Sequence, residues 1–329
     1  MKYKAFLVQV DSNGVAYRNI VDRKLDELPD NDVLIKVHWS SLNYKDALSA
    51  SGNRGVTRNY PHTPGIDAAG VVVESRAKDV HAGDKVIVTS YDLGMNTAGG
   101  FAEYIRVPGN WIVPLPDGLD LREAMIIGTA GFTAGMSVSA LCHSVPADQG
   151  EIAVSGATGG VGSMAVAILA RLGYSVVAIS GKKEAGSFLK TLGVSRIITR
   201  QEAMEDIERL LLKEKWAGAV DTVGGEMLVA LIKATGRCGV VTCCGNVASP
   251  ELSLNVYPFI LRGVTLQGID SQNCPMELRR KIWAQLASKW KPLQLNSLCR
   301  EVNFSDIEDE IETILKGGQT GRVLIKVKA

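Results

Sequence analysis

The sequence lacks the cysteine and histidine patterns that hold metal ions. Its six cysteines form no Cys-x-x-Cys pair, and its four histidines form no His-x₃-His or comparable set. Cys142 and His143 are neighbours, but one adjacent pair does not supply the ligands of a zinc site. We therefore predict no structural or catalytic metal. Without a visible secretion signal, the cysteines are expected to be reduced thiols of a cytoplasmic protein.

The chain also lacks an excess of charge and an evident targeting segment. Its formal net charge is +1, which argues against a nucleic-acid or anionic-membrane surface. Residues 1–10 lack a signal-peptide core and are expected to form a strand. Residues 124–147 carry no charge but are rich in glycine, serine and threonine. They predict a buried helix at a domain junction rather than a membrane span.

What remains is typical of a two-domain α/β protein. The chain has 329 residues, 46% of them hydrophobic, enough for two sizeable cores. The first 120 residues look all-β, with short strands such as 33–38 and 85–89 between turn residues. From about Glu123, helices and strands alternate, which predicts a parallel sheet of about six strands.

The expected elements after Glu123 follow this alternation. The expected strands are 175–180, 196–199, 218–223, 239–244 and 264–269, and the expected helices are 184–192, 201–214 and 227–234. Helices at 276–287 and 307–315 and a closing strand at 322–327 complete the chain. The closing strand can rejoin the first domain, so the sheet domain would be an insertion. The predicted division is 1–123 with 272–329, and 124–271.

The turn after residue 154 carries the clearest functional signal. A short apolar strand enters a turn that contains Gly156, Gly159, Gly160 and Gly162, and a helix leaves it. Glycines let the backbone approach a ligand, and the free N–H groups and dipole of the following helix favour an anion. Its spacing differs from the usual G-x-G-x-x-G, but the strand–turn–helix–strand context predicts a site for a dinucleotide pyrophosphate. The alternative is an ordinary tight turn.

The residues after the second strand of this unit indicate the cofactor. An NAD site usually places Asp or Glu there, to bind the ribose 2′-hydroxyl. Here the sequence is Ser180-Gly181-Lys182-Lys183, and the first carboxylate is Glu184. A hydroxyl and two ammonium groups suit a 2′-phosphate, so we expect NADPH rather than NADH. The alternative is two solvated surface lysines.

Five stretches together resemble the medium-chain dehydrogenase/reductase superfamily over nearly the whole chain. They are residues 40–46, 64–70, 127–134, 257–263 and 268–271. The likeness is to the zinc-free branch whose members are named quinone oxidoreductase or NADPH-dependent acrylyl-CoA reductase. It implies a GroES-like domain enclosing a Rossmann domain, and a homodimer. Zinc enzymes of the superfamily carry a Cys where this chain has residues 43–46, and Gly-His-Glu where it has residues 65–67.

The resemblance implies reduction of an activated C=C bond in a small, electron-poor α,β-unsaturated carbonyl compound or thioester, such as acrylyl-CoA. Quinone reduction is the alternative activity, and a non-catalytic NADPH-binding sensor or structural protein is the alternative class. Without zinc, hydrogen-bond donors must stabilise the developing enolate. The catalytic candidates are Tyr44 and Asn43 as donors and Asp46 as an orienting group. Alternatively, Asn43 and Asp46 brace a turn while Tyr44 packs on the cofactor.

The resemblance also implies a set of cofactor-binding residues. For the pyrophosphate they are Thr158, Gly159, Gly160 and Val161; for the 2′-phosphate, Ser180, Gly181, Lys182 and Arg196; for the nicotinamide side, Tyr44, Asn246, Ile260 and Ser271; and Arg322 would reach the bound cofactor. For a CoA ester, basic residues are expected near the substrate, with Arg54, Arg58 and Arg76 as candidates. The strand 264–269 is the candidate dimer edge.

Overall fold

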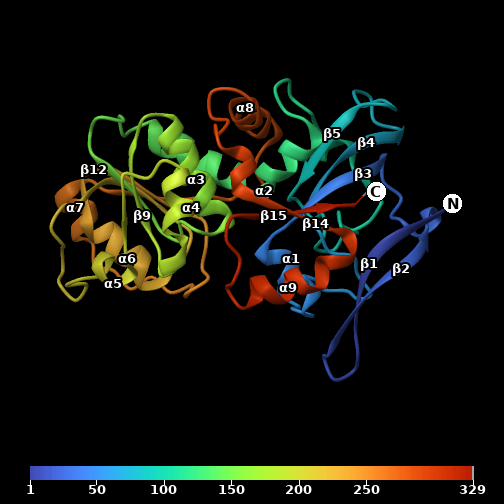
Figure 1. Cartoon of the computed structure of the whole chain (residues 1–329), viewed down its shortest axis with the longest axis horizontal. Coiled ribbons are helices and arrows are strands. Elements are labelled where there is room, and N and C mark those ends of the chain that lie inside the picture. Colours follow the sequence, from blue (N-terminus) through green and yellow to red (C-terminus); the bar gives the residue numbers. More distant parts are fainter. Residues whose placement is uncertain (328–329) are drawn as a thin grey trace. The chain divides into compact units, whose positions relative to one another are not determined.

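The computed structural model describes residues 1–327, without the side chain of Lys183, as two compact units (Figure 1). The first unit comprises Met1–Thr129, Gln272–Ala287 and the chain from Cys299 onward. The second comprises Ala130–Ser271 and Ser288–Leu298. The domain boundaries at 123/124 and 271/272 stay a prediction. Unlike the predicted division, the two units assign residues 288–298 to the second unit.

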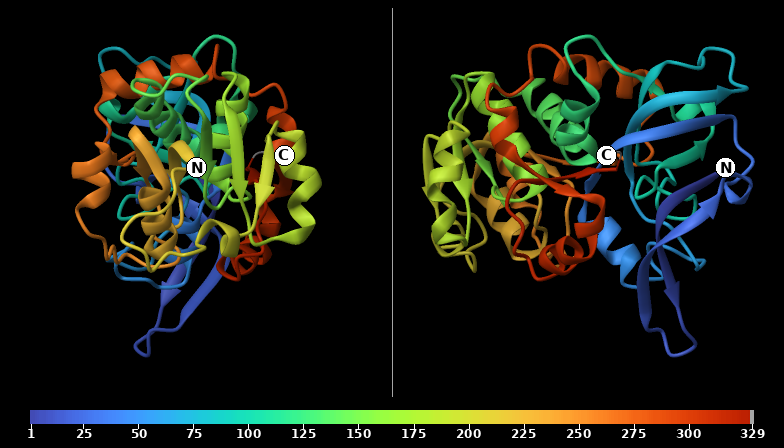
Figure 2. Two further views of the ribbon diagram at one scale, coloured as in Figure 1. Left: turned by 90° about the vertical axis from the view of Figure 1, so that its left-hand side faces the viewer. Right: turned by 45° about the vertical axis from the view of Figure 1, so that its right-hand side comes forward.

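The first unit is built on two sheets whose strands are antiparallel except for the parallel pair β14–β15. A two-stranded hairpin joins β1 (Lys2–Val10) to β2 (Ala16–Lys24), drawn in dark blue in Figure 2. A larger sheet has the order β14-β15-β3-β4-β5-β7, with β6 paired to β3. Its strands are β3 (Val33–Leu42), β4 (Asp67–Ser75), β5 (Lys85–Thr89), β6 (Tyr104–Val107), β7 (Val113–Pro114), β14 (Cys299–Asn303) and β15 (Arg322–Lys326). Because β15 pairs with β3, the closing strand rejoins the first unit as expected.

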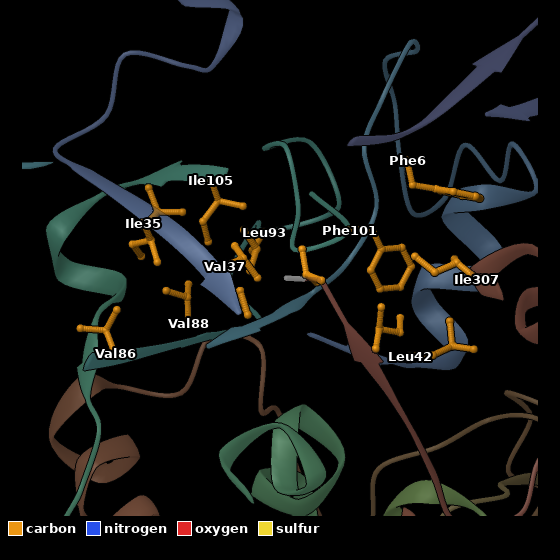
Figure 3. Packing of buried hydrophobic residues seen from close by; sticks show 14 of the residues in the cluster. Phe6, Ile35, Val37, Leu42, Val86, Val88, Leu93, Phe101, Ile105 and Ile307 are labelled. Atoms are coloured by element: carbon orange, nitrogen blue, oxygen red, sulfur yellow. The ribbon is translucent and has the colours of Figure 1, made fainter. Parts of the chain in front are cut away.

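Alternating side chains of these strands form the core of the first unit. Ile35 and Val37 of β3 belong to one buried cluster with Val86 and Val88 of β5 (Figure 3). Phe101 meets Phe6 edge to face, with ring centroids 6.3 Å apart. A period of two along each strand is what a sheet with one buried face requires.

The helices α1 (Tyr44–Ala50), α8 (Met276–Leu286) and α9 (Ile307–Leu315) lie wholly in the first unit. The expectation that the first 120 residues are all-β is therefore wrong at α1. That helix starts where the Asp46 carboxylate accepts the Asn43 N–H at 2.8 Å, the reciprocal half of a helix-capping interaction. α1 packs against α9 (Figure 1).

The second unit contains a six-stranded parallel sheet in the order β10-β9-β8-β11-β12-β13. This is the order of a doubly wound sheet, so the predicted fold class is confirmed. The strands are β8 (Glu151–Val154), β9 (Ser175–Ile179), β10 (Arg196–Ile198), β11 (Trp216–Asp221), β12 (Thr235–Cys243) and β13 (Thr265–Gly268). The crossover helices are α3 (Gly160–Arg171), α4 (Gly186–Thr191), α5 (Arg200–Ala203), α6 (Gly225–Ala234) and α7 (Tyr257–Arg262).

The predicted helix at 201–214 is largely wrong. α5 ends at Ala203, and Asp206 takes a left-handed backbone conformation with φ of 59°. Further along, the Leu212 N–H donates to the Lys233 carbonyl, and the Leu212 carbonyl accepts from Arg262. Helix propensity is overridden because neighbouring elements take the backbone hydrogen bonds of this segment.

Short 3₁₀ turns occur at Leu25–Glu27, Gly109–Trp111, Lys183–Ala185, Leu295–Leu298 and Phe304–Asp306.

One long apolar helix, α2 (Leu121–Cys142), is kinked at Gly128, whose φ and ψ are 51° and −160°. Among residues 1–327 it is the one helix long and apolar enough to cross a membrane. Of its 18-residue apolar stretch, 72% is buried within the protein. A Cβ at residue 128 would lie 2.5 Å from an Asp67 carboxylate oxygen, so this kink needs glycine.

Candidate functional site

The turn between β8 and α3 has the geometry of an anion cradle. Gly156 has φ of +56°, and a Cβ there would lie 2.4 Å from Thr222 Oγ1. A Cβ at Gly162 would lie 2.2 Å from the Gly156 carbonyl oxygen. Both contacts are too short for any real side chain, so the tight turn depends on these two glycines.

The amino terminus of α3 opens from this turn. Its N-cap is Gly159, which has no side chain to accept the N–H groups of the first turn. These N–H groups have no acceptor inside the helix, and the helix dipole adds positive potential beside them. Thr158, Gly160 and Val161 lie in the same turn as the resemblance implied. The residues present therefore fit a pyrophosphate.

A buried hydrogen-bond network under the turn holds it to β11. The Ser155 hydroxyl donates to Asp221 Oδ1 at 2.6 Å and accepts the Thr222 N–H at 3.0 Å. The Gly224 N–H donates to Asp221 Oδ2 at 2.8 Å. Burial raises the pKa of Asp221, while these hydrogen bonds lower it. The network fixes two adjacent strand ends, which rigidifies the cradle above them.

The end of β9 gathers a hydroxyl and two cations. The Ser180 hydroxyl accepts the Lys182 N–H at 3.0 Å. Arg200 lies over Gly181, since a Cβ at that glycine would be 3.2 Å from Arg200 Nε. Burial lowers the pKa of Lys182; Glu184 raises it, and the charge of Arg200 lowers it further. The positive charges of Lys182 and Arg200 repel each other, and a ligand with more than one negative charge would offset this repulsion.

The structure does not bring Arg196 to this group, so its assignment to the 2′-phosphate is corrected. Arg196 starts β10, and its guanidinium pairs with Glu151 at 2.9 and 2.7 Å. Glu151 begins β8, at the amino edge of the sheet, whereas the glycine turn follows its carboxyl edge. Arg200, which follows the carboxyl end of β10, occupies the expected place. Its position just after a strand was the signal that sequence reading missed.

Two of the three residues assigned to the nicotinamide side within the second unit follow carboxyl ends of strands. Asn246 comes after β12 and is exposed, and the Ser271 hydroxyl, after β13, accepts from Thr133 at 2.8 Å. Ile260 does not follow the carboxyl end of a strand, and its assignment to the nicotinamide side stays a prediction. It lies on α7, whose Arg262 donates to the Thr235 carbonyl at the amino end of β12. Ile260 is 67% exposed there.

In the first unit, Asp46 is a fully buried carboxylate surrounded by donors. Its oxygens accept the N–H groups of Asn43 at 2.8 Å, Ile66 at 2.8 Å and Gly65 at 3.2 Å. Burial, and next the nearby charge of Asp67, raise its pKa to about 7 against these hydrogen bonds. A carboxylate with no exposed surface cannot reach a substrate, so Asp46 positions the start of α1 and does not touch reacting atoms.

A second buried carboxylate, Asp67, pairs with Arg322. The Arg322 guanidinium lies 3.5 Å from Asp67 and also donates to Ser41 Oγ at 2.8 Å and to the Ile126 carbonyl at 3.1 Å. It is 1% exposed. Burial lowers the pKa of Arg322, and Asp67 opposes this. Because its donors serve the protein, the geometry favours a positioning role for Arg322 over the predicted direct contact with a cofactor.

Of the three catalytic candidates, only Tyr44 is open to solvent. Asn43 is 9% exposed; its amide nitrogen donates to Asp67 at 2.8 Å, and its amide oxygen accepts from Arg322 at 3.1 Å. Tyr44 is 41% exposed at the first position of α1. The next residue, Lys45, donates to Gln272 at 2.8 Å. The geometry thus separates one accessible hydroxyl from the buried groups that hold it.

Comparison with known proteins fits this arrangement. A family model described as "Alcohol dehydrogenase GroES-like domain" matches residues 29–117, and one described as "Zinc-binding dehydrogenase" matches residues 160–288. Yet residues 1–327 contain no cluster of three or more His, Cys, Asp or Glu side chains placed to hold a metal ion. At the positions where the resemblance implies Cys and His in zinc members, this chain has Asn43 to Asp46 and Ile66.

Two curated bacterial relatives cover nearly the whole chain. "Putative quinone oxidoreductase YhfP" of Bacillus subtilis is 45% identical over 92% of both chains. "Probable acrylyl-CoA reductase AcuI" of Escherichia coli is 46% identical over 98% of both chains.

Solved structures agree with these relatives. The yhdH oxidoreductase from Salmonella enterica in complex with NADP has a TM-score of 0.96, 42% identity and full coverage of both chains. The Bacillus subtilis protein yhfP with NAD bound has a TM-score of 0.97 and 42% identity over 99% of both chains. The glycine turn, the doubly wound sheet and these matches lead to one conclusion: the chain belongs to the medium-chain dehydrogenase/reductase superfamily, alongside YhfP and AcuI.

Proposed function

We propose that the chain is an NADPH-dependent oxidoreductase that reduces the activated C=C bond of an α,β-unsaturated carbonyl compound or thioester, with acrylyl-CoA as the model substrate. The proposal rests chiefly on the glycine turn at Gly156 with the cations after β9 and β10. The name of the Escherichia coli relative supports the substrate class.

The preference for NADPH rests on this chain's own residues, because one similar structure holds NADP and another holds NAD. Ser180, Lys182 and Arg200 surround the place where an NAD site would carry an acid. The charge of Arg200 lowers the pKa of Lys182, so the two cations lie close enough to repel each other. A 2′-phosphate would offset this repulsion and accept charge-assisted hydrogen bonds from both side chains.

The proposed chemistry uses one accessible donor and a rigid support. When bound, NADPH supplies the hydride to the β-carbon of the substrate. The Tyr44 hydroxyl would donate a hydrogen bond to the carbonyl oxygen, where negative charge develops. Asn43 and Asp46 fix the backbone that carries Tyr44, and Lys45 is held by Gln272. A proton then reaches the α-carbon from Tyr44 or from water.

Turnover separates the proposed activity from its alternatives. NADPH consumption is measured with acrylyl-CoA and with a small quinone at matched enzyme concentration. Faster reduction of acrylyl-CoA is expected. The name of the Bacillus subtilis relative favours the quinone as the second candidate. A sensor or structural protein would bind NADPH in calorimetry and turn over neither substrate. Tighter binding of NADH than of NADPH would defeat the cofactor proposal.

A homodimer through the edge of the second unit's sheet is also proposed. β13 is an edge strand, and the preceding α7 region exposes Val256, Ile260 and Leu261 by 59%, 67% and 53%. An unpaired edge beside apolar side chains favours pairing with a two-fold mate.

A cytoplasmic location is proposed as well. Its support is that the six cysteines form no disulfide in the structure.

A further inference from the structure

One loop of the first unit concentrates positive charge without acidic partners. Residues 47–66 contain Arg54 and Arg58 but no Asp or Glu. Both arginines are exposed, on the segment 51–60, which we call the arginine loop. Across from it, Asp92 accepts from Asn96 at 2.9 Å and from Thr97 at 3.1 Å, so its carboxylate is already engaged.

This lack of ion pairs is unusual for arginines in the first unit. Most of the others contact a carboxylate: Arg18, Arg23, Arg76, Arg106, Arg122, Arg300 and Arg322. Arg76, a sequence candidate for a CoA ester, is held by Asp30 at 2.6 Å. Arg54 and Arg58 form no ion pair within the described residues. They are therefore available to an anionic ligand.

The arginine loop is held in place by its own contacts. The Arg54 guanidinium lies 5.3 Å from the centre of the Tyr60 ring and donates to the Arg58 carbonyl. The Tyr60 hydroxyl donates to the Ser49 carbonyl at 2.6 Å, and the Arg58 N–H donates to Asn96 at 3.2 Å. A preordered loop loses less entropy when a ligand binds.

The loop is also placed relative to the catalytic candidate. It leaves the carboxyl end of α1, and the chain returns at Gly65 and Ile66, which donate to Asp46 in the first turn of α1. Tyr44 and the arginine loop thus lie at opposite ends of a helix about 10 Å long. A ligand that meets both needs a reactive carbonyl at one end and phosphates at the other. A CoA thioester has this form, because a long arm joins its acyl group to its nucleotide phosphates.

We propose that Arg54 and Arg58 bind the phosphates of a CoA thioester and make the enzyme selective for CoA esters over enones and quinones that lack phosphate. The inference rests on the proposed reductase activity and names its substrate class. Arginine binds phosphate through several donors in a planar fork, which gives strong charge-assisted hydrogen bonds.

The experiment compares two substrates with the same reactive acyl group, acrylyl-CoA and acrylyl-pantetheine, which lacks the nucleotide phosphates. Steady-state kcat/KM is measured for wild type, Arg58→Gln and the Arg54→Gln/Arg58→Gln double variant. Arg58→Gln is the cleaner single change, because only the backbone of Arg58 makes the hydrogen bonds described above. Arg280→Gln is the matched control, because Arg280 is an exposed arginine on α8 that forms no ion pair with any described carboxylate.

Wild type is expected to prefer acrylyl-CoA, and the double variant to lose at least tenfold of that preference, through KM for acrylyl-CoA. Arg280→Gln should keep the wild-type ratio. An equal loss on both substrates, or no loss on either, overturns the inference. A rise in KM for NADPH without a change in the substrate ratio also overturns it. If wild type reduces acrylyl-pantetheine as well as acrylyl-CoA, the inference fails while the reductase function stands. If it reduces neither, both fail.

Discussion

At the Asp46 side chain, burial and hydrogen bonding act in opposite directions on one carboxylate. Burial dominates and raises its pKa from 3.8 to about 7. Because the folded pKa exceeds the unfolded one, the stability contributed by the neutral group is full below pH 4 and is lost as pH rises to about 7. The shift corresponds to a loss on the order of 4 kcal/mol.

Asp46→Asn should remove this pH dependence. The variant will be less stable at every pH, because an amide N–H would face the Asn43 donors. However, the wild-type advantage in free energy of unfolding should shrink between pH 4 and pH 7. Urea unfolding of both proteins across this range measures it, and titrations of groups that do not interact with Asp46 cancel in the difference. A constant difference would show that Asp46 keeps an ordinary pKa when folded.

The cations at the end of β9 and after β10 should decide between NADPH and NADH. Arg200→Gln or Lys182→Gln removes a charge-assisted contact to the 2′-phosphate and should weaken NADPH binding about tenfold to a hundredfold. NADH binding should hardly change. Arg196→Gln is the matched control, because that arginine is paired with Glu151. Calorimetry gives the affinities. A loss of NADPH affinity in Arg196→Gln equal to that in Arg200→Gln would restore the original assignment.

The Tyr44 hydroxyl should matter for turnover and not for folding. Tyr44→Phe keeps the ring but removes the donor, so kcat with acrylyl-CoA should fall on the order of a hundredfold at unchanged thermal stability. Tyr17→Phe, at another exposed tyrosine of the first unit, should leave kcat unchanged. If Tyr44→Phe turns over acrylyl-CoA at the wild-type rate, the hydroxyl has no role in catalysis and the ring only packs against the bound cofactor.

At the level of elements, the turn between β8 and α3 tolerates no side chain at Gly156. Gly156→Ala adds a left-handed backbone penalty of about 1 kcal/mol and a clash with Thr222, so NADPH affinity and stability should both fall. Gly173→Ala is the control, because φ there is +84° but nothing lies within 4 Å of the added carbon. It should lower stability only slightly and leave affinity unchanged. Equal effects of the two changes would mean that the Thr222 contact is relaxed at little cost.

The elements that the sequence predicted well are those with one strong local signal. Apolar runs bounded by turns identified β9, β11 and β12, because strands of a parallel sheet are buried on both faces. α1 was missed because it is short and lies among strands, although Asn43 and Asp46 were recognised as bracing residues. The helix expected at 201–214 failed because its helix formers gave no sign that Lys233 and Arg262 take its hydrogen bonds.

For the whole molecule, the dimer proposal predicts a simple change of mass. Ile260→Glu with Leu261→Glu puts two charges on the apolar surface beside β13 and should convert a dimer to a monomer in sedimentation velocity. Leu293→Glu, at a residue of the second unit that is 72% exposed, should not. A wild-type protein that sediments as a monomer at every concentration would exclude the dimer.

The site shows which information the sequence could not carry. Glycine spacing and Ser180 with Lys182 were readable because each group is contiguous. Arg196 and Arg200 are four residues apart, but Arg196 begins β10 and Arg200 follows its end, so the two arginines lie at opposite edges of the sheet. Likewise, nothing local links Arg322 to Asp67 and Ser41, which meet only when β15 pairs with β3. Long-range pairing decides such assignments.

The pairing of β15 with β3 has a consequence for synthesis on the ribosome. β6 pairs with residues 33–36 of β3, but the partner of residues 39–42 is β15, so this end of β3 cannot pair until residue 326 has been made. Until then the Asp67 carboxylate lacks its guanidinium counter-charge. The strands of the second unit lie between β3 and β15 in the sequence, so they are synthesised before this pairing can form. Truncation before residue 322 should therefore destabilise β3 and the surroundings of Asp67, although their own sequence is unchanged.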